Sequence, residues 1–233
     1  MPSCGHSHSH GHSHGPPPIP TNSSQSINDR VSLSKLAGLN MANPPSDLQA
    51  LFKTRETKNS LRPAIRSDAD NQLILKVPFD GIVKLYSIIL RTNGQPDHCP
   101  STIKLFKNND ALDFDTIGSV HPTSTLSHPL VGHLEDLSAI SRDDELVDET
   151  EDQFVEHYLP RNQFNGTTSL TLFFEDTHSH DEDEPVIIYS VELRGEFAEL
   201  TRDPVITLYE SAANPADHKL PLSQQNLNSQ GFD

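Results

Sequence analysis

The sequence has no tryptophan, and aromatic residues make up only 6% of its 233 residues. Proteins often bind sugars and nucleobases by stacking them on aromatic rings, so we expect no large aromatic platform for such ligands. Cysteine is also scarce. The two cysteines, Cys4 and Cys99, form no Cys-x-x-Cys pair, and Cys4 lies in a polar tail. Neither a structural disulfide nor thiol redox chemistry is therefore expected.

Long apolar runs are absent as well. Residues 1–30 are polar and contain no apolar segment typical of a signal peptide, and no later run is long enough to cross a bilayer. These features predict a soluble, cytoplasmic protein, with the nucleus as an alternative location.

The chain has few basic residues. The chain has 17 Lys and Arg residues against 33 Asp and Glu residues, which gives a net charge of −16 with histidine neutral. Nucleic acids and anionic membranes both attract basic surfaces, so the sequence predicts no nucleic-acid partner and no membrane partner. The acidic residues cluster at 135–156 and 181–184. Such runs are either solvated loops or a docking patch for a basic protein partner.

The composition divides the chain into two tails and one domain. Residues 1–27 are rich in His, Gly, Ser and Pro, and residues 223–233 are rich in Gln, Asn and Ser. Both segments have too few apolar residues to fold, which predicts disordered tails. Residues 28–222 are the single predicted domain. Within it, residues 119–152 are polar and acidic with little periodicity, which predicts a long loop.

Apolar and polar residues alternate in several short segments, as in β-strands. A tight hairpin at Asp80-Gly81 is expected to join the first two strands, and Asn165-Gly166 gives a turn between two later ones. Ser46 is well placed to cap a short helix before the strands. The pattern predicts an all-β antiparallel sandwich or barrel, with short helical turns near the N-terminus. The predicted strands are residues 72–79, 82–91, 102–107, 154–159, 170–174, 186–194 and 205–209.

The N-terminal tail contains an alternating histidine tract. In an extended chain this alternation places the imidazole side chains on one side, and a flexible tract can wrap Zn²⁺, Ni²⁺ or Cu²⁺. A flexible site loses chain entropy on binding and discriminates poorly between metals. We therefore predict adventitious metal binding and no cofactor. The candidate ligands are His6, His8, His10, His12 and His14.

Two further groups of residues allow either a metal site or a structural role. His178 and His180, followed by the acidic run 181–184, form a second potential metal cluster or lie in a solvated hairpin loop. Asp68 and Asp70 could bind Ca²⁺ or could accept backbone hydrogen bonds in an Asx-turn before the first strand. The loop interpretation is favoured in both cases.

Two more groups lie near the C-terminal end. Asp217 and His218 are adjacent, but no nucleophile motif accompanies them, so a loop that closes the sandwich edge is favoured over a catalytic pair. Glu192, Arg194 and Glu196 share one face of a predicted strand, which indicates a ladder of ion pairs.

Three blocks, in order along the chain, carry a resemblance to one known family. They are Ser67-Asp68-Ala69-Asp70 with LILKVPFDGIVKLYSIIL, then PSTIKLFKN with Phe114-Asp115, and then residues 186–218 with Leu193-Arg194-Gly195-Glu196 and Ala213-Asn214-Pro215-Ala216-Asp217-His218. Together with the His/Gly/Ser-rich start, these blocks resemble the PITH domain, the proteasome-interacting domain at the C-terminus of certain thioredoxin-related proteins. The chain is more similar to the stand-alone members, which lack thioredoxin.

The resemblance implies a β-sandwich of jelly-roll type, related to galactose-binding-like domains, and a link to the regulatory particle of the proteasome. No thioredoxin domain precedes the matching blocks, so oxidoreductase activity is not implied. The leading hypothesis is a monomeric, non-enzymatic adaptor that binds a protein partner, with the regulatory particle as the partner that the resemblance suggests. The alternatives are a jelly roll that binds a small molecule or glycan, and a metal carrier that acts through residues 6–14.

Overall fold

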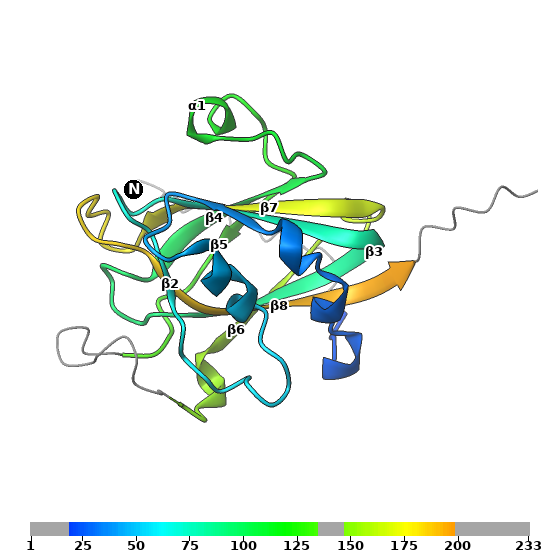
Figure 1. Ribbon diagram of the computed structural model, residues 1–233, viewed down its shortest axis with the longest axis horizontal. Coiled ribbons are helices and arrows are strands. Elements are labelled where there is room, and N and C mark those ends of the chain that lie inside the picture. Colours follow the sequence, from blue (N-terminus) through cyan, green and yellow to red (C-terminus); the bar gives the residue numbers. More distant parts are fainter. Residues whose placement is uncertain (1–18, 135–146, 199–233) are drawn as a thin grey trace, which may run out of the picture. The chain divides into compact units, whose positions relative to one another are not determined.

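The computed structural model describes residues 19–134 and 147–198, which all lie in one compact unit, Met1–Leu200 (Figure 1). No helix within these two ranges is long and apolar enough to span a membrane. The strands are β1 (Ala37–Leu39), β2 (Ile65–Arg66), β3 (Leu73–Thr92), β4 (Pro100–Lys107), β5 (Ser124–Ser127), β6 (Phe154–Tyr158), β7 (Thr167–Thr177) and β8 (Ile187–Ala198). The 3₁₀ turns are η1 (Ser23–Gln25), η2 (Asn28–Arg30), η3 (Leu33–Lys35), η4 (Pro45–Leu51) and η5 (Glu151–Gln153), and α1 is Phe114–Ile117.

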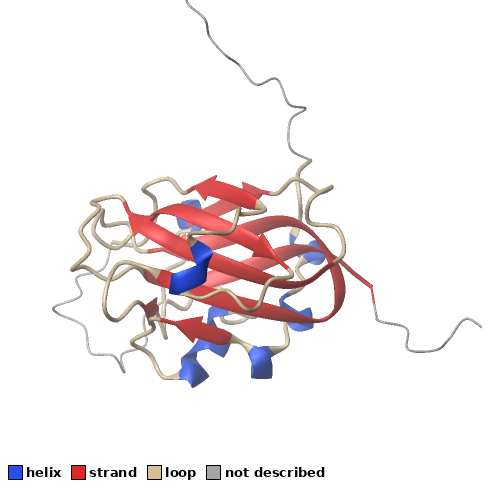
Figure 2. Cartoon of the chain, turned by 90° about the horizontal axis from the view of Figure 1, so that it is seen from above, coloured by secondary structure: helices blue, strands red, loops and turns tan. Residues whose placement is uncertain are grey.

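Strand β3 takes part in both layers of the sandwich. Its first part, up to Pro78, lies between β1 and β7, and its second part, from Ile82 onward, lies between β6 and β8. Strand β7 pairs in turn with β4, and β4 with β5, whereas β8 pairs with β2. All these pairs are antiparallel, and Figure 2 shows the strands in stacked layers. The predicted antiparallel β-sandwich of jelly-roll type is confirmed.

The predicted hairpin at Asp80-Gly81 is wrong, because β3 runs through these residues without a turn. A tight hairpin of this sequence needs positive φ at its central residues, and Gly81 does not have it, whereas Gly166 has φ of 71°. Gly81 is instead required by close packing. A Cβ at this position would lie 2.8 Å from the carbonyl oxygen of Ala198 and 2.8 Å from the ring of Phe197. Gly81 therefore lies where β3 changes its partner strands, and the chain does not reverse its direction there.

The main apolar core lies between the two layers. It contains Leu75 and Leu85 of β3, Leu105 of β4, Leu172 of β7 and Leu193 of β8. The opposite face of the first part of β3 is also covered, because Ile74 packs in a second cluster beneath α1. The predicted strand 82–91 is the second part of β3, and its residues 87–91 are interior because they pair with β6 on one side and with β8 on the other.

The domain begins earlier than the predicted boundary at residue 28. Residues 19–27 were assigned to the disordered tail, but Ile27 is 4% exposed and its N–H donates to the carbonyl of Leu193 at 2.9 Å. The short helix near Ser46 is confirmed as η4, which buries Leu48 and Leu51. It begins at Pro45, without the expected side-chain cap from Ser46.

The predicted loop at 119–152 is partly structured. It contains β5, and the stretch after β5 is fixed to β3, because the N–H of His133 donates to the carbonyl of Thr92 at 3.0 Å. The far end carries η5 and is held by the buried side chain of Arg91, as described below. Residues 135–146 lie outside the described segments. This stretch shows no apolar periodicity in the sequence because the anchoring contacts are mostly polar.

Candidate functional site

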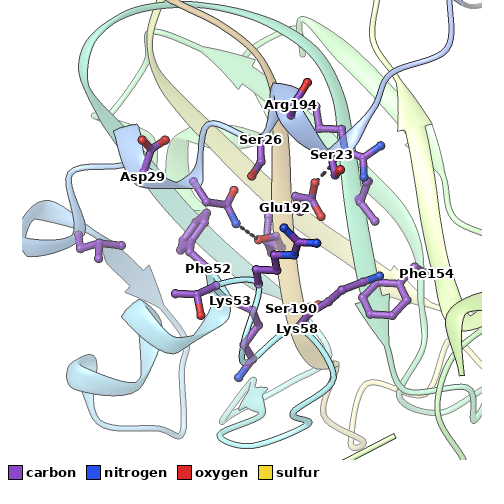
Figure 3. Close-up of a pocket in the computed structure, with 17 residues that line it drawn as sticks. Ser23, Ser26, Asp29, Phe52, Lys53, Lys58, Phe154, Ser190, Glu192 and Arg194 are labelled. Atoms are coloured by element: carbon purple, nitrogen blue, oxygen red, sulfur yellow. Dashed lines mark hydrogen bonds and ion pairs between the residues drawn. The ribbon is translucent and has the colours of Figure 1, made fainter. Parts of the chain in front are cut away.

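A cavity of about 790 Å³ lies beside β8 (Figure 3). Three separate segments enclose it. These are residues 21–30, here called the N-terminal wall, residues 53–60, here called the basic loop, and the middle of β8. Figure 3 shows Ser26 of the wall and Lys53 of the loop beside the β8 residues Ser190 and Glu192. The lining residues are Ser23, Ser24, Ser26, Asn28, Asp29, Leu33, Phe52, Lys53, Thr54, Arg55, Lys58, Ile89, Phe154, Ser190, Val191, Glu192 and Arg194.

The floor of the cavity is apolar. Phe52 and Val191 belong to the edge of the main core, and Ile89 of β3 is 7% exposed beside them. Leu33 and Phe154 stand at the sides, and Leu33 is one of the large apolar residues that remain exposed, at 39%. The three floor residues are at most 8% exposed, so the apolar surface that a partner can cover lies mostly on Leu33 and the partly exposed Phe154 beside them.

The N-terminal wall is held on β8 by side chain–backbone hydrogen bonds. The side chain of Asn28 donates to the carbonyl of Val191 at 3.1 Å and accepts from the N–H of Leu193 at 2.8 Å. Near the start of the wall, the hydroxyl of Thr21 accepts from Arg194 Nη1 at 3.1 Å and donates to Glu156. The wall is thus part of the sandwich, and it closes one side of the cavity.

The predicted ion pair on β8 is present. Arg194 Nε lies 2.7 Å from Glu192 Oε1, and Nη1 of the same side chain lies 3.8 Å from Glu156 Oε1. Glu196 takes no part in this ladder, and its carboxylate instead accepts from the phenol of Tyr86, whose pKa is raised by burial and by this contact. Charge on the β8 side of the cavity is therefore largely balanced.

The basic loop carries three cations with different partners. Lys58 Nζ lies 2.8 Å from Glu151 Oε1, and it also sits 5.2 Å from the ring centre of Phe154. Lys53 Nζ donates to the carbonyl of Arg62 at 2.8 Å, and burial lowers the pKa of Lys53 to about 8. Among the described residues, no carboxylate lies within 4.0 Å of the exposed side chain of Arg55. Within the described chain, Lys53 and Arg55 thus form no ion pair, although Glu56 lies beside Arg55 in the same loop.

A second polar group lies in the interior, around His128. Its Nδ1 is 2.8 Å from Nε2 of His157, its Nε2 is 3.1 Å from the hydroxyl of Thr92, and its carbonyl is 2.9 Å from Nε2 of His178. Burial lowers the pKa of His128 to about 3 and also lowers the pKa of His157. Both imidazoles are therefore neutral at pH 7. The described residues contain no group of three His, Cys, Asp or Glu side chains arranged to hold a metal ion.

The neighbouring thiol of Cys99 is fully buried, and burial raises its pKa. Its Sγ has only weak contacts, the nearest to the carbonyl of Pro129 at 3.7 Å and to the hydroxyl of Thr92 at 3.8 Å. A nucleophilic cysteine needs a lowered pKa and access to substrate. Cys99 has neither property, because its thiol is buried and its pKa is raised.

Arg91 is the largest fully buried side chain. Its Nη2 donates to the carbonyl of Asp148 at 3.0 Å and to Gln153 Oε1 at 2.9 Å, and it lies 3.4 Å from Asp148 Oδ2. His133 Nδ1 contacts the same carboxylate oxygen at 2.5 Å. Hydrogen bonds from Thr150 and His133, together with the charge of Arg91, hold the pKa of Asp148 well below its usual value. This network anchors residues 147–153 and is enclosed by its own partners.

The residues proposed as Ca²⁺ ligands form a turn. The carboxylate of Asp70 accepts from the N–H of Gln72 at 2.9 Å and from Asn40 Nδ2 at 2.6 Å, as in the Asx-turn interpretation. His178 and His180 do not converge, because His178 contacts the carbonyl of His128 while His180 pairs with Asp176.

Other predicted site residues lie outside the described segments. These are the histidine tract (His6, His8, His10, His12 and His14) and the pair Asp217 and His218. Of the block 186–218, residues 187–198 form β8, and the predicted strand 205–209 is likewise outside the described segments.

No pattern in the sequence predicted the cavity. The one local signal was the spacing of Lys53, Arg55 and Lys58 in a chain with few cations. The approach of His128 to His157 had no signal at all, since His128 follows β5, His157 lies on β6, and neither residue belongs to a motif.

The chain matches the family model "PITH domain" over residues 17–213. It is 33% identical to PITH domain-containing protein P35G2.02 of Schizosaccharomyces pombe, over 77% of each chain. It is 31% identical to human PITH domain-containing protein 1, over 82% of this chain and 79% of that protein. Among solved structures, it is similar to CBM32-3 from a family 31 glycoside hydrolase of Clostridium perfringens, with 13% identity, a TM-score of 0.44 and coverage of 75% of this chain and 97% of that one.

Proposed function

The chain belongs to the PITH domain family, and we propose that it is a non-enzymatic adaptor that binds a protein partner at the cavity beside β8. The observation that carries this proposal is the combination of an apolar floor with a rim of cations, of which Arg55 is exposed and Lys53 and Lys58 are partly buried. Protein interfaces commonly have an apolar centre that receives an anchor side chain and a polar rim that excludes water. The cavity beside β8 has both parts.

The proposed partner is the regulatory particle of the proteasome. The support for this partner is family membership, because the domain is associated with that particle in thioredoxin-linked members. The chain itself contributes a surface on which the two charge signs are separated, with cations in the basic loop and a net charge of −16 overall. Such separation fixes the orientation of a docked protein and makes the association sensitive to salt.

The interior polar groups support a non-enzymatic role. His128 is buried and hydrogen-bonded at both ring nitrogens, and Cys99 is buried with a raised pKa. General bases and nucleophiles must reach their substrate, so groups enclosed by their own partners are poorly placed for catalysis.

The test is capture of purified regulatory particle by the full chain, with Arg55→Glu as the variant and Lys35→Glu as the matched control. Lys35 is exposed and does not line the cavity. Both variants replace a positive charge by a negative one, so they differ only in the position of the change. We expect Arg55→Glu to weaken capture about tenfold or more and Lys35→Glu to leave it nearly unchanged. Equal capture by both variants would contradict docking at the cavity. No capture by the unmodified chain at low salt would contradict the proteasome assignment.

A second candidate function is the binding of a small molecule, because a volume of about 790 Å³ falls within the range of small-molecule pockets. A ligand that binds the native state raises the melting temperature. Thermal-shift measurements with glycans and divalent metals, on the full chain and on a chain without residues 1–15, distinguish this function from metal binding by the histidine tract. A shift that disappears with the truncation belongs to the tract and not to the cavity.

A further inference from the structure

The charge of the basic loop is opposite to that of the chain around it. The whole chain has a net charge of −16, whereas Lys53, Arg55 and Lys58 line the same cavity. The two carboxylates in the lining do not cancel these cations. Glu192 is paired with Arg194 at 2.7 Å, and Asp29 lies 3.3 Å from Arg30. The uncompensated charge at the cavity is therefore positive.

The chain already holds an acidic segment against the far end of the basic loop. Residues 147–153 have the sequence VDETEDQ, and Val147 forms an antiparallel bridge with Ser60. The N–H of Asp148 donates to the carbonyl of Asn59 at 3.0 Å, and the ammonium of Lys58 lies 2.8 Å from Glu151. The loop thus binds an acidic segment through its backbone and through one cation.

Lys53 and Arg55 belong to the same loop, but the acidic segment does not reach them. Within the described chain, the ammonium of Lys53 contacts a backbone carbonyl, and Arg55 forms no ion pair within 4.0 Å, although its neighbour Glu56 is close enough for their charges to interact. Carboxylates pair with guanidinium and ammonium groups through charge-assisted hydrogen bonds, which are stronger than hydrogen bonds between neutral groups. A second acidic segment at this end of the loop would supply the partners that these two cations lack.

The apolar floor sets a further requirement on the occupant. Phe52, Ile89 and Val191 lie at the base of the cavity, between the basic loop and the N-terminal wall. An extended acidic segment that crosses the rim can place one large side chain on this floor. Such an anchor adds apolar burial to the charge pairing at the rim, and the combination distinguishes the occupant from a merely acidic polymer.

We propose that the cavity accepts an extended acidic segment of a partner protein, with one large apolar side chain on the floor and carboxylates against Arg55 and Lys53. This proposal rests on the proposed function and names the chemistry of the partner. The chain as a whole has a net charge of −16, which disfavours the binding of an acidic segment away from the cations of the basic loop.

The test uses the full chain and three fluorescein-labelled peptides of sequence DEDFEDE, DEDAEDE and QNQFQNQ, with binding measured by fluorescence anisotropy. DEDFEDE should bind tightest, and its affinity should fall as salt is raised. Removal of the phenyl ring should weaken binding about tenfold, and removal of the charges should weaken it at least as much. Equal binding of DEDFEDE and DEDAEDE would overturn the anchor, and equal binding of DEDFEDE and QNQFQNQ would overturn the acidic requirement.

Variants of the chain locate the peptide. Arg55→Gln should weaken the binding of DEDFEDE about fivefold, and the matched Lys35→Gln should leave it unchanged. Because Arg55 is exposed, its replacement should not affect folding, and circular dichroism checks this for both variants. Unchanged binding to the folded Arg55→Gln variant would overturn the site. Full displacement of the peptide by inorganic phosphate would show a small-anion site only and would also overturn the proposal.

Capture of the regulatory particle separates this proposal from the proposed function. If capture depends on Arg55 but no peptide binds, the acidic segment is wrong and the docking site stands. If DEDFEDE binds at the cavity but the regulatory particle is not captured, the acidic segment remains the proposed occupant and the proteasome assignment is wrong.

Discussion

The cavity beside β8 and the interior network around Arg91 both gather charged side chains from distant segments, but they differ in where the partners of those charges lie. Arg91 is fully buried and donates to Asp148 and Gln153 within the chain. Arg55 is exposed at the rim of the cavity and has no carboxylate within 4.0 Å among the described residues.

The difference separates a structural charge from a candidate binding charge. A buried guanidinium is stabilised by the hydrogen bonds that it makes, and those of Arg91 Nη2 fix the segments that supply the acceptors, although its buried Nε has no partner in the described chain. An exposed guanidinium needs no such partner, and it remains available to a second molecule. A cluster of polar residues is therefore not by itself a site, and the location of the partners decides its role.

The largest expected effect is that of Arg91→Leu. Loss of the guanidinium removes its hydrogen bonds to residues 148–153 and leaves Asp148 without its cation. Removal of one member of a buried ion pair typically costs about 3–5 kcal/mol of unfolding free energy. Urea denaturation measures this loss, with Arg55→Leu as the matched variant. Equal destabilisation by the two variants would contradict the distinction between the two regions.

A second effect is a loss of stability in mild acid, from the His128 and His157 pair. Burial holds the folded pKa of His128 at about 3, below the value of about 6.5 in an unfolded chain. Above pH 6.5 the pair contributes no pH dependence. As the pH falls below 6.5, the unfolded state binds a proton that the folded state does not bind, so stability decreases. The expected loss from His128 is about 2 kcal/mol between pH 6.5 and pH 5.

Asp148 affects the unfolding free energy only at lower pH. Its folded pKa lies below its unfolded value, so its contribution is present above about pH 4 and is lost only as the pH falls further. Denaturant titrations between pH 7 and pH 5 therefore isolate the histidines. His128→Gln should flatten this slope, and replacement of the exposed His121 should not. If the unfolding free energy of the His128→Gln variant still decreases as steeply between pH 7 and pH 5, other groups cause the decrease.

The sequence predicted the strands well where one face meets the core and the signal is local. Residues 102–107, 154–159, 170–174 and 186–194 all lie in or next to observed strands. It failed at Asp80-Gly81, because the residues of a tight turn are also those that let two strands cross closely. It also failed at residues 19–27, because the burial of Ile27 depends on Leu193, far away along the chain.

The cavity was hidden from the sequence for the same reason. Its walls come from residues 23–29, 52–58 and 190–194, and only the tertiary fold brings these segments together. The basic loop was visible as a local cluster of cations, but its role depends on which carboxylates reach it. Lys58 has such a partner and Arg55 does not.

A smaller effect is expected at the N-terminal wall, from Asn28→Ala. This change removes two hydrogen bonds to the β8 backbone and should cost about 1–2 kcal/mol of unfolding free energy. Amide hydrogen exchange should be faster at Leu193, whose N–H loses its acceptor. Asn162→Ala, at an exposed residue, is the matched control and should change stability by less than about 0.5 kcal/mol. Unchanged exchange at Leu193 would contradict the attachment of the wall through Asn28.

The smallest expected effect on stability is that of Arg55→Gln. The side chain is exposed and forms no ion pair within 4.0 Å in the described chain, so the unfolding free energy should change by no more than about 0.5 kcal/mol. Capture of the regulatory particle should nevertheless become weaker and less sensitive to salt, because one rim charge is lost. The two regions would be separated by experiment if the Arg55 substitution weakened partner binding without changing stability, while the Arg91 substitution lowered stability at a residue that does not contact the partner. A large loss of stability in Arg55→Gln would instead place this arginine with the structural charges.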